Sequence, residues 1–244
     1  MLCVSKSLGQ STSTDLEEPV RPRYELPKRE RDWKPSAFYI SYDIIQLINS
    51  ASSDRFHTEF NAKVDFDQFF LAFDYGWSDR QITETGFDYS FEGNYYRIGP
   101  EVDFMPYNKS RSSLFIGLKY AWSNFEDQIT YSTSSDQWDQ SDLTFANDNL
   151  KARWFEVNFG LSARIAGPVF MGYVVRFKLS QNLSETSELT PYQIPGYGRA
   201  DKTSNFGFSY YITYRLGFRK KPVPKRPEKA KRLEDTKIPA KENE

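Results

Sequence analysis

Apolar and polar residues alternate along several segments of this chain. The clearest segment is 155–165, where alternate positions are all apolar: Phe155, Val157, Phe159, Leu161, Ala163 and Ile165. The positions between them are mainly polar: Glu156, Asn158, Gly160, Ser162 and Arg164. Because successive side chains of a β-strand point to opposite faces, this pattern predicts a strand with one apolar face and one polar face.

The same alternation predicts eight strands, at residues 36–49, 55–65, 68–79, 93–105, 112–131, 151–165, 169–181 and 203–219. Their apolar faces carry no charged residue, although 27% of the chain is charged. Pro100 lies within the apolar set of the fourth strand. Because proline lacks the backbone donor of a strand ladder, it predicts a bulge or a local break there.

The connections between the predicted strands differ in length. Tight turns at 65–67, 107–111 and 166–168 alternate with long polar loops at about 80–92, 132–150 and 182–202. The connection 50–54 falls on the side of the long loops but is short. Short periplasmic turns and longer external loops are typical of outer-membrane barrels. The pattern therefore places both termini of the barrel on the periplasmic side.

The alternation fits two kinds of barrel. A lipocalin-like barrel has its apolar face inside, whereas a membrane barrel turns that face to lipid. The predicted strands are about twice as long as the roughly 5–6 residues of soluble strands. Aromatic residues make up 17% of the chain, and several, such as Trp77 and Trp122, lie near strand ends, where membrane-interface girdles form. We therefore predict an all-β, eight-stranded antiparallel up-and-down transmembrane β-barrel with flexible polar termini.

Composition limits the remaining classes of protein. The mean hydropathy is −0.68 and no run of 18 apolar residues exists, so no membrane-spanning helix is expected. The net charge of −1 gives no general attraction to nucleic acid. Cys3 is the only cysteine, which excludes an intrachain disulfide and a cysteine metal cluster.

The segments outside the barrel are polar. Residues 1–10 resemble the end of a bacterial signal peptide, and the alternative is an ordinary flexible terminus. Residues 11–35, rich in proline and charge, predict a flexible periplasmic lead-in to a barrel at 36–219. Residues 220–244 form a basic, proline-rich tail. We expect this tail either to bind an anionic partner or to be simply solvated; its candidate partner-binding residues are Lys220, Lys221, Lys225, Arg226, Lys229, Lys231 and Arg232.

The polar face of the predicted strands carries charges of both signs in similar number. Buried charges must be paired, and eight strands leave an interior just wide enough for side chains. We therefore predict an ion-pair network that closes the lumen, with a narrow ion path as the alternative. The network residues are Glu59, Lys63, Arg97, Glu101, Asp103, Lys119, Glu156, Arg164, Arg176 and Arg215; Asp43, Asp74 and Lys178 share this face.

Candidate chemistry is sparse. His57, the only histidine, is expected on the lumen face beside Glu59, where a lipid hydrolase would need a serine such as Ser41 or Ser53 nearby, and nothing marks one. The acidic loop 132–150 does not have the spacing of an EF-hand and is expected to be solvated. Gly196 and Gly198 are expected as turn residues, and Tyr192 and Tyr197 as residues of the loop rim. We expect no catalytic residue, metal or cofactor.

The last strand, Tyr210–Phe218, resembles the aromatic-ended closing strand that the barrel-assembly machinery recognises, although residues 219–244 follow it. With the strand pattern, it makes residues 36–219 resemble small eight-stranded bacterial outer-membrane β-barrel proteins. The whole chain is similar to an uncharacterised family of such barrels with a Pro/Lys-rich periplasmic tail.

These observations lead to a hypothesis about function. We expect a non-enzymatic outer-membrane barrel that is a structural or accessory subunit of an envelope complex, for example in barrel assembly or secretion. Outer-membrane lipid and a protein are the expected partners, bound through loops and tails, and nucleic acid is not. The alternatives are a narrow pore for ions or small solutes, an envelope lipid-modifying enzyme and a soluble ligand-binding barrel.

Overall fold

The computed structural model describes residues 24–25, 31–45, 48, 55–135, 138–183, 191–224 and 231–232. The chain divides into two units. In the unit formed by residues 1–30 and 226–244, the short strands β1 (Tyr24–Glu25) and β12 (Lys231–Arg232) pair antiparallel. The predicted signal-peptide remnant at 1–10 lies outside the described residues, as does most of the predicted lead-in.

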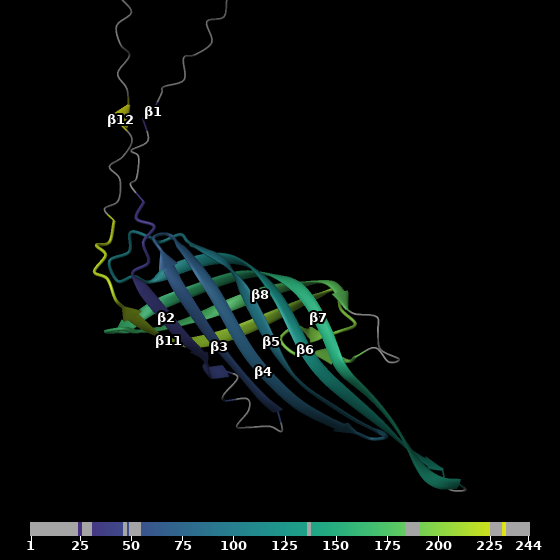
Figure 1. Cartoon of the computed structure of the whole chain (residues 1–244). Coiled ribbons are helices and arrows are strands. Elements are labelled where there is room, and N and C mark those ends of the chain that lie inside the picture. The colour runs from purple at the N-terminus through teal and green to yellow at the C-terminus, as the bar shows by residue number, and fades with distance from the viewer. Residues whose placement is uncertain are drawn as a thin grey trace, which may run out of the picture. The chain divides into compact units, whose positions relative to one another are not determined.

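The other unit, residues 31–225, is a closed barrel of eight antiparallel strands (Figure 1). Each strand pairs with its neighbours in sequence, and β11 closes the barrel by pairing with β2. This confirms the predicted fold class. The strands are β2 (Ala37–Asp43), β3 (Arg55–Phe66), β4 (Phe69–Glu84), β5 (Phe87–Asp103), β6 (Ser113–Ser135), β7 (Trp138–Ala166), β8 (Val169–Leu183) and β11 (Ser204–Gly217).

The apolar set of each strand faces outward. Leu118 is 55% exposed and Phe159 is 54% exposed, whereas the opposite, charged face is buried inside the barrel. Aromatic rings also lie against one another on the outer surface, such as Tyr96 on Trp122 at 5.5 Å. A closed barrel with an apolar outer belt and a charged interior is a transmembrane barrel of the outer-membrane type. The soluble alternative with an apolar interior is therefore wrong.

Pro100 interrupts one ladder without shifting it. It lies opposite Leu71 of β4. On the other side of β5 the pairing passes from Ile98–Tyr120 to Glu101–Gly117 in the same register. The proline therefore produces a local break and not a bulge, as expected for a residue with no backbone N–H.

The three tight turns lie at one end of the barrel, which we call the short-turn end. The described N- and C-terminal flanks meet there, where Phe218 N and Arg219 N both donate to Ser36 O. The opposite end, which we call the long-hairpin end, differs from the prediction. Two of its three expected polar loops are strands: β4 and β5 meet at a turn containing Gly86 (φ +95°), and β6 and β7 extend to Ser135 and Trp138.

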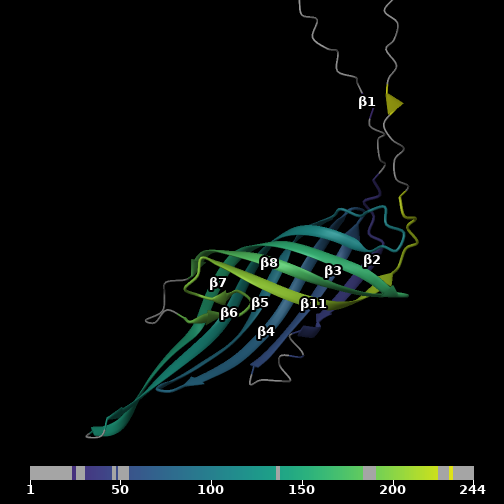
Figure 2. The ribbon, with the colours of Figure 1, turned by 180° about the vertical axis from the view of Figure 1, so that it is seen from behind.

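These extensions form a sheet, called the arm here, that consists of residues 80–84, 87–91, 125–135 and 138–151. Its β6–β7 part projects well beyond the barrel (Figures 1 and 2). The predicted loops were wrong because the alternation continues there in the opposite phase. Positions such as Ile82 and Ile129 are apolar and face inward, while the outward positions are polar.

The first strand is shorter than predicted. β2 ends at Asp43, and Ile44 and Ile45 are helical. Asp43 Oδ1 accepts a hydrogen bond from Ile45 N at 3.0 Å, as an N-cap residue does, which explains why the strand stops there. None of the helical residues that the structure describes belongs to a helix long and apolar enough to cross a membrane.

Candidate functional site

The lumen contains a layer of buried ion pairs centred on Arg97 of β5. Its guanidinium lies 2.9 Å from Glu59 of β3 and 2.9 Å from Glu156 of β7. Arg176 of β8 also contacts both carboxylates, at 2.7 Å and 3.7 Å respectively. All four side chains are at most 3% exposed. Strands β3, β5, β7 and β8 are therefore joined through the centre of the barrel.

A second group of pairs lies on the short-turn side of this layer. Lys119 Nζ contacts Asp74 at 2.8 Å and Glu101 at 3.2 Å, and Lys63 Nζ lies 2.6 Å from Glu101. A 3.8 Å contact between Arg97 and Asp74 connects the two groups. The connected network thus holds four carboxylates and four cations, so its formal charges cancel. Such balance is what burial of charge requires.

Three of the ten residues predicted for this network lie outside it. Asp103 accepts a hydrogen bond from Met105 N (2.9 Å), Arg164 is exposed and donates to Gly167 O (2.6 Å), and Arg215 donates to Tyr39 Oη (3.2 Å). They lie near the short-turn end, where turn backbone and solvent take the place of ion partners. Asp74 belongs to the network but was absent from the ten; its only sequence signal was its position on the polar face.

Two tyrosines complete the polar contacts of Glu59. Tyr95 Oη donates to Glu59 Oε2 (2.6 Å), and Tyr211 Oη donates to Glu59 Oε1. His57 Nε2 lies 2.9 Å from Tyr95 Oη. Because the single hydroxyl proton of Tyr95 points to Glu59, His57 is the donor to Tyr95. The histidine is thus held, through Tyr95, against a carboxylate.

The serines considered for hydrolysis are not brought to His57 in the part of the chain that is described. Ser41 Oγ accepts from Thr213 (2.9 Å) and contacts Asn61 (3.3 Å). Asn61 is four residues along β3 from His57, a distance of about 13 Å in a strand. Ser53 lies outside the described residues.

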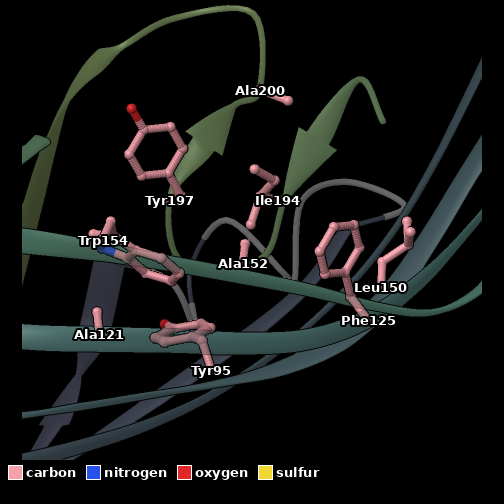
Figure 3. Packing of buried hydrophobic residues seen from close by; sticks show 9 residues of the cluster. All are labelled: Tyr95, Ala121, Phe125, Leu150, Ala152, Trp154, Ile194, Tyr197 and Ala200. Carbon is pink, nitrogen blue, oxygen red and sulfur yellow. The ribbon is translucent and has the colours of Figure 1, made fainter. Parts of the chain in front are cut away.

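A short hairpin enters the barrel at its long-hairpin end. It consists of β9 (Gln193–Ile194) and β10 (Gly198–Arg199), joined by residues 195–197. Tyr197 is 1% exposed and packs edge-on against Trp154 at 5.6 Å (Figure 3). The third long loop, expected at 182–202, is thus partly an ordered plug in which Tyr197 lies inside the mouth, while Tyr192 stays 49% exposed.

The turn of this hairpin is bonded to the cations below it. Gly196 O accepts from Arg97 Nη2 (3.2 Å) and from Lys178 Nζ (2.7 Å). Gly196 has φ +76°, and a Cβ at this position would lie 2.4 Å from the ring of Tyr95. Only glycine tolerates both the positive φ and the close approach of the Tyr95 ring, so Gly196 allows the plug to take this position.

Two cavities lie on either side of the ion-pair layer. The cavity toward the short-turn end measures only about 40 Å³ and is lined by residues such as Lys63, Phe115 and Tyr211. The cavity toward the long-hairpin end measures about 640 Å³ and is lined by His57, Glu59, Lys178 and the plug, among others. The barrel interior is therefore nearly filled on one side of the network and open on the other.

The tail residues begin close to the barrel. Lys221 Nζ donates to Asp32 O (2.7 Å) and lies 3.8 Å from Asp67, while Lys220 is exposed. Arg219 contacts the carboxylate of Asp32. In β12, Lys231 lies opposite Glu25 and Arg232 opposite Tyr24. The remaining predicted tail residues, Lys225, Arg226 and Lys229, lie outside the described residues.

Metal-ligating side chains do not gather in groups of three or more in the described part of the chain. The acidic segment 132–150 is mostly strand, and Asp136 within it lies outside the described residues.

A family model described as "Domain of unknown function (DUF6048)" matches residues 20–221. The chain belongs to this family. The match covers the whole barrel, so the ion-pair layer and the plug are parts of a DUF6048 domain.

Solved barrels are similar to the DUF6048 barrel at low identity. Neisserial surface protein A is 12% identical, with 75% of this chain and 95% of that chain covered and a TM-score of 0.40. The N-terminal β-barrel domain of Pseudomonas aeruginosa OprF is 10% identical (75% and 100% covered, TM-score 0.38). The attachment invasion locus protein Ail of Yersinia pestis is 11% identical (75% and 98% covered, TM-score 0.39). A comparison with curated proteins gives no significant match.

Proposed function

We propose that this protein is a non-enzymatic outer-membrane barrel that serves as an accessory subunit of an envelope complex and binds a protein partner through its arm. In this proposal the short-turn end and both termini face the periplasm, and the arm stands outside the cell. The observation that carries the proposal is the reversed polarity of the arm. Beyond the aromatic band at Trp77 and Trp122, the apolar side chains change from the outer face to the inner face.

The inner face of the arm forms a continuous apolar surface across four strands. Phe87, Tyr131 and Leu143 lie opposite one another in one row. The adjoining row consists of Ile82, Tyr89, Ile129 and Phe145. Leu143 is 57% exposed, Phe145 41% and Tyr131 40%, outside the lipid belt. Contiguous apolar surface exposed to water marks an interaction site.

The shape of the arm also supports a protein as the partner. A cavity of about 440 Å³ lies between the inner face and the Tyr192–Gln193 segment. Along residues 138–151, β7 pairs with β6, and its pairing with β8 begins only at Ala152–Leu183. Within the described residues, this edge keeps its backbone groups available for an added strand. A partner with an extended apolar segment can therefore both cover the inner face and pair with β7.

The layer of ion pairs across the lumen favours this role over that of a pore. The charged layer formed by Arg97, Arg176 and their carboxylates crosses the barrel, and its members are at most 3% exposed. Conduction requires a path through the lumen, and here the ion partners occupy it. The barrel then acts as a rigid anchor that presents the arm.

Two matched variants test the proposal. Leu143→Ser combined with Phe145→Ser removes apolar side chains from the inner face, whereas Gln128→Ala combined with Thr144→Ala changes the outer face of the same strands. Protein purified in mild detergent should migrate as a complex in the wild type and in the outer-face variant, and as a monomer in the inner-face variant. Heat-dependent gel migration should show a folded barrel in all three. Recovery of the wild type as a lone monomer, or equal loss in both variants, would contradict the proposal.

A further inference from the structure

Among the described residues, no strand lies between β3 and β11 on the side of the long-hairpin end, and we call this gap in the ladder the opening. β2 pairs with β11 only as far as Asp43–Tyr211, and with β3 only as far as Tyr42–Phe60. Beyond these pairs, and within the described part of the chain, residues 55–59 of β3 pair only with β4, and residues 204–210 of β11 pair only with β8. In the connection from β2 to β3, Ile44, Ile45 and Ile48 are the residues that the structure describes.

Asp43 lies at the end of β2, where the opening begins. Its carboxylate is fully buried, and Oδ1 accepts from Ile45 N (3.0 Å) and from Tyr210 N (3.4 Å). One side chain thus ends β2 and also satisfies a backbone donor at the edge of β11. At this margin Asp43 thus satisfies a donor that would be unfavourable if it were left unpaired inside a membrane.

The 640 Å³ cavity passes through this opening. It is lined by Phe56 and His57, which face opposite sides of β3, and by the four consecutive residues 206–209 of β11. A cavity lined by both faces of the same strands extends from the lumen to the outer surface. Thr58 of β3 lies opposite Trp77, so the opening is level with the aromatic band at the membrane interface.

The two ends of the cavity differ in chemistry. The lumen end has Arg97, Arg176 and Lys178, together with Glu59, which is paired with both arginines. Lys178 Nζ donates to Gly196 O (2.7 Å) and Tyr197 O (3.3 Å), and no carboxylate of the described residues lies within 4.0 Å of it. At the outer end Phe56 is 48% exposed, Phe206 76% and Phe208 51%. One end thus has a cation without a carboxylate partner, and the other is apolar and meets lipid.

We propose that this cavity binds a phosphate-bearing lipid of the leaflet at the long-hairpin end, which is the outer leaflet in the orientation proposed above. The phosphate lies beside Lys178, whose ammonium group is a favourable phosphate partner. An acyl chain leaves through the opening between Phe56 and Phe208. At about 30 Å³ per water, the cavity has room for roughly twenty waters, which suits a phosphorylated glycerol or sugar headgroup but not whole acyl chains. The aromatic outer end favours a lipid over free phosphate, because free phosphate gains nothing from it.

Photocrosslinking of the full chain in detergent tests the site. The probe is a phosphatidic acid with a diazirine at the end of one acyl chain. The control probe is the diacylglycerol of the same chains. The phosphatidic acid should label peptides that contain Phe56 and Phe206–Phe208. Lys178→Gln should reduce this labelling roughly tenfold, because loss of one charge-assisted hydrogen bond has about that effect. Glutamine can still donate to Gly196 O, so the plug should remain in place.

Lys151→Gln is the matched control, since Lys151 is exposed on β7 and does not line the cavity; its labelling should equal that of the wild type. Equal labelling by the diacylglycerol would overturn the phosphate assignment. Labels spread around the barrel belt would show surrounding lipid only. If inorganic phosphate competed completely with the phosphatidic acid, and no acyl label appeared at the opening, the site would be one for free phosphate. That result would overturn the lipid assignment.

Access to the cavity provides an independent measurement. A Ser209→Cys variant in a Cys3→Ser background places a thiol in the cavity lining. The thiol should react with a lipid-soluble maleimide and should be protected by phosphatidic acid. A thiol that stays unreactive in lipid-free detergent would contradict lipid entry there.

Discussion

Glu59 and Arg176 meet in the middle of the barrel, 2.7 Å apart, although β11 and β2 separate their strands in the barrel wall. Both side chains are at most 3% exposed. The pair therefore braces the lumen from one wall to another and adds a contact that no strand ladder provides.

Removal of one member of this pair should destabilise the barrel strongly. Arg176→Met leaves Glu59 with one ion partner in place of two, which should lower the free energy of unfolding by about 3 kcal/mol. Urea unfolding in detergent, followed by tryptophan fluorescence, measures the change. Arg164→Met, at an exposed arginine near the short-turn end, is the control and should stay within about 0.5 kcal/mol of the wild type. Equal stability of the two variants would contradict the bracing role.

The same network should keep the barrel closed to ions. In planar bilayers the wild type should produce no discrete channel openings, because the ion pairs form a closed layer across the lumen. If conduction does occur through the charged layer, Arg176→Ala should change the current or its ion selectivity. Wild-type openings that respond to this variant would favour the narrow-pore function over an anchoring role.

Two leucines of similar exposure should respond differently to charge. Leu118 of β6 is 55% exposed in the outer belt, and Leu143 of β7 is 57% exposed on the arm. Leu118→Arg places a cation in lipid and should lower stability by about 2–4 kcal/mol. Leu143→Arg meets water and should change stability by less than about 0.5 kcal/mol. Unfolding of both variants in lipid vesicles tests where the membrane ends, and similar losses would place the arm in the lipid.

The plug should depend on Gly196. Gly196→Ala introduces a Cβ at φ +76° and only 2.4 Å from the ring of Tyr95, so the hairpin cannot keep its position. Limited proteolysis should then cut within residues 191–203, which resist in the wild type. Gly167→Ala is a useful comparison, because it also has a positive φ (+50°) but lies in a turn with open space. It should leave cleavage of the plug unchanged; plug cleavage in both variants would indicate general loosening.

Acid should release the C-terminal flank from the N-terminal flank. The Lys34 backbone N–H, which donates to Asp32 Oδ1 (3.1 Å), and the nearby Arg219 hold the pKa of Asp32 below its ordinary value. A lowered pKa in the folded state means that the contact is stabilising above about pH 4 and is lost as the pH falls below it. Cleavage beside Phe218 by an acid-active protease should therefore rise as the pH falls below about 4. Asp32→Asn should show the raised cleavage already at about pH 5, where the wild type resists, and an unchanged profile would contradict the link.

Much of the fold followed from local pattern. The outward positions of all eight strands, from Phe38 to Leu216, were predicted because a strand exposes alternate residues whatever its neighbours are. The seven network members among the ten predicted residues followed from the same rule, because a charged side chain buried on the inner face is unfavourable unless it has an ion partner. Asp103, Arg164 and Arg215 also lie on the polar face, but the alternation does not show how close a residue lies to the end of the barrel.

The sequence by itself determined that the strands have one apolar and one polar face, which residues share each face and which turns are tight. Only the tertiary structure showed that the apolar face lies outside, because the alternation fits both kinds of barrel. The tertiary structure decided three further features: the arm, the plug and the opening beside Asp43. In the sequence, Phe87 and Leu143 look like loop residues, and only the strand register shows that they lie in one row. Gly196 looks like an ordinary turn residue, and only the structure shows that Tyr95 packs against it. Phase is a local property, whereas register and contacts across the lumen depend on strands that the chain brings together only when the barrel closes.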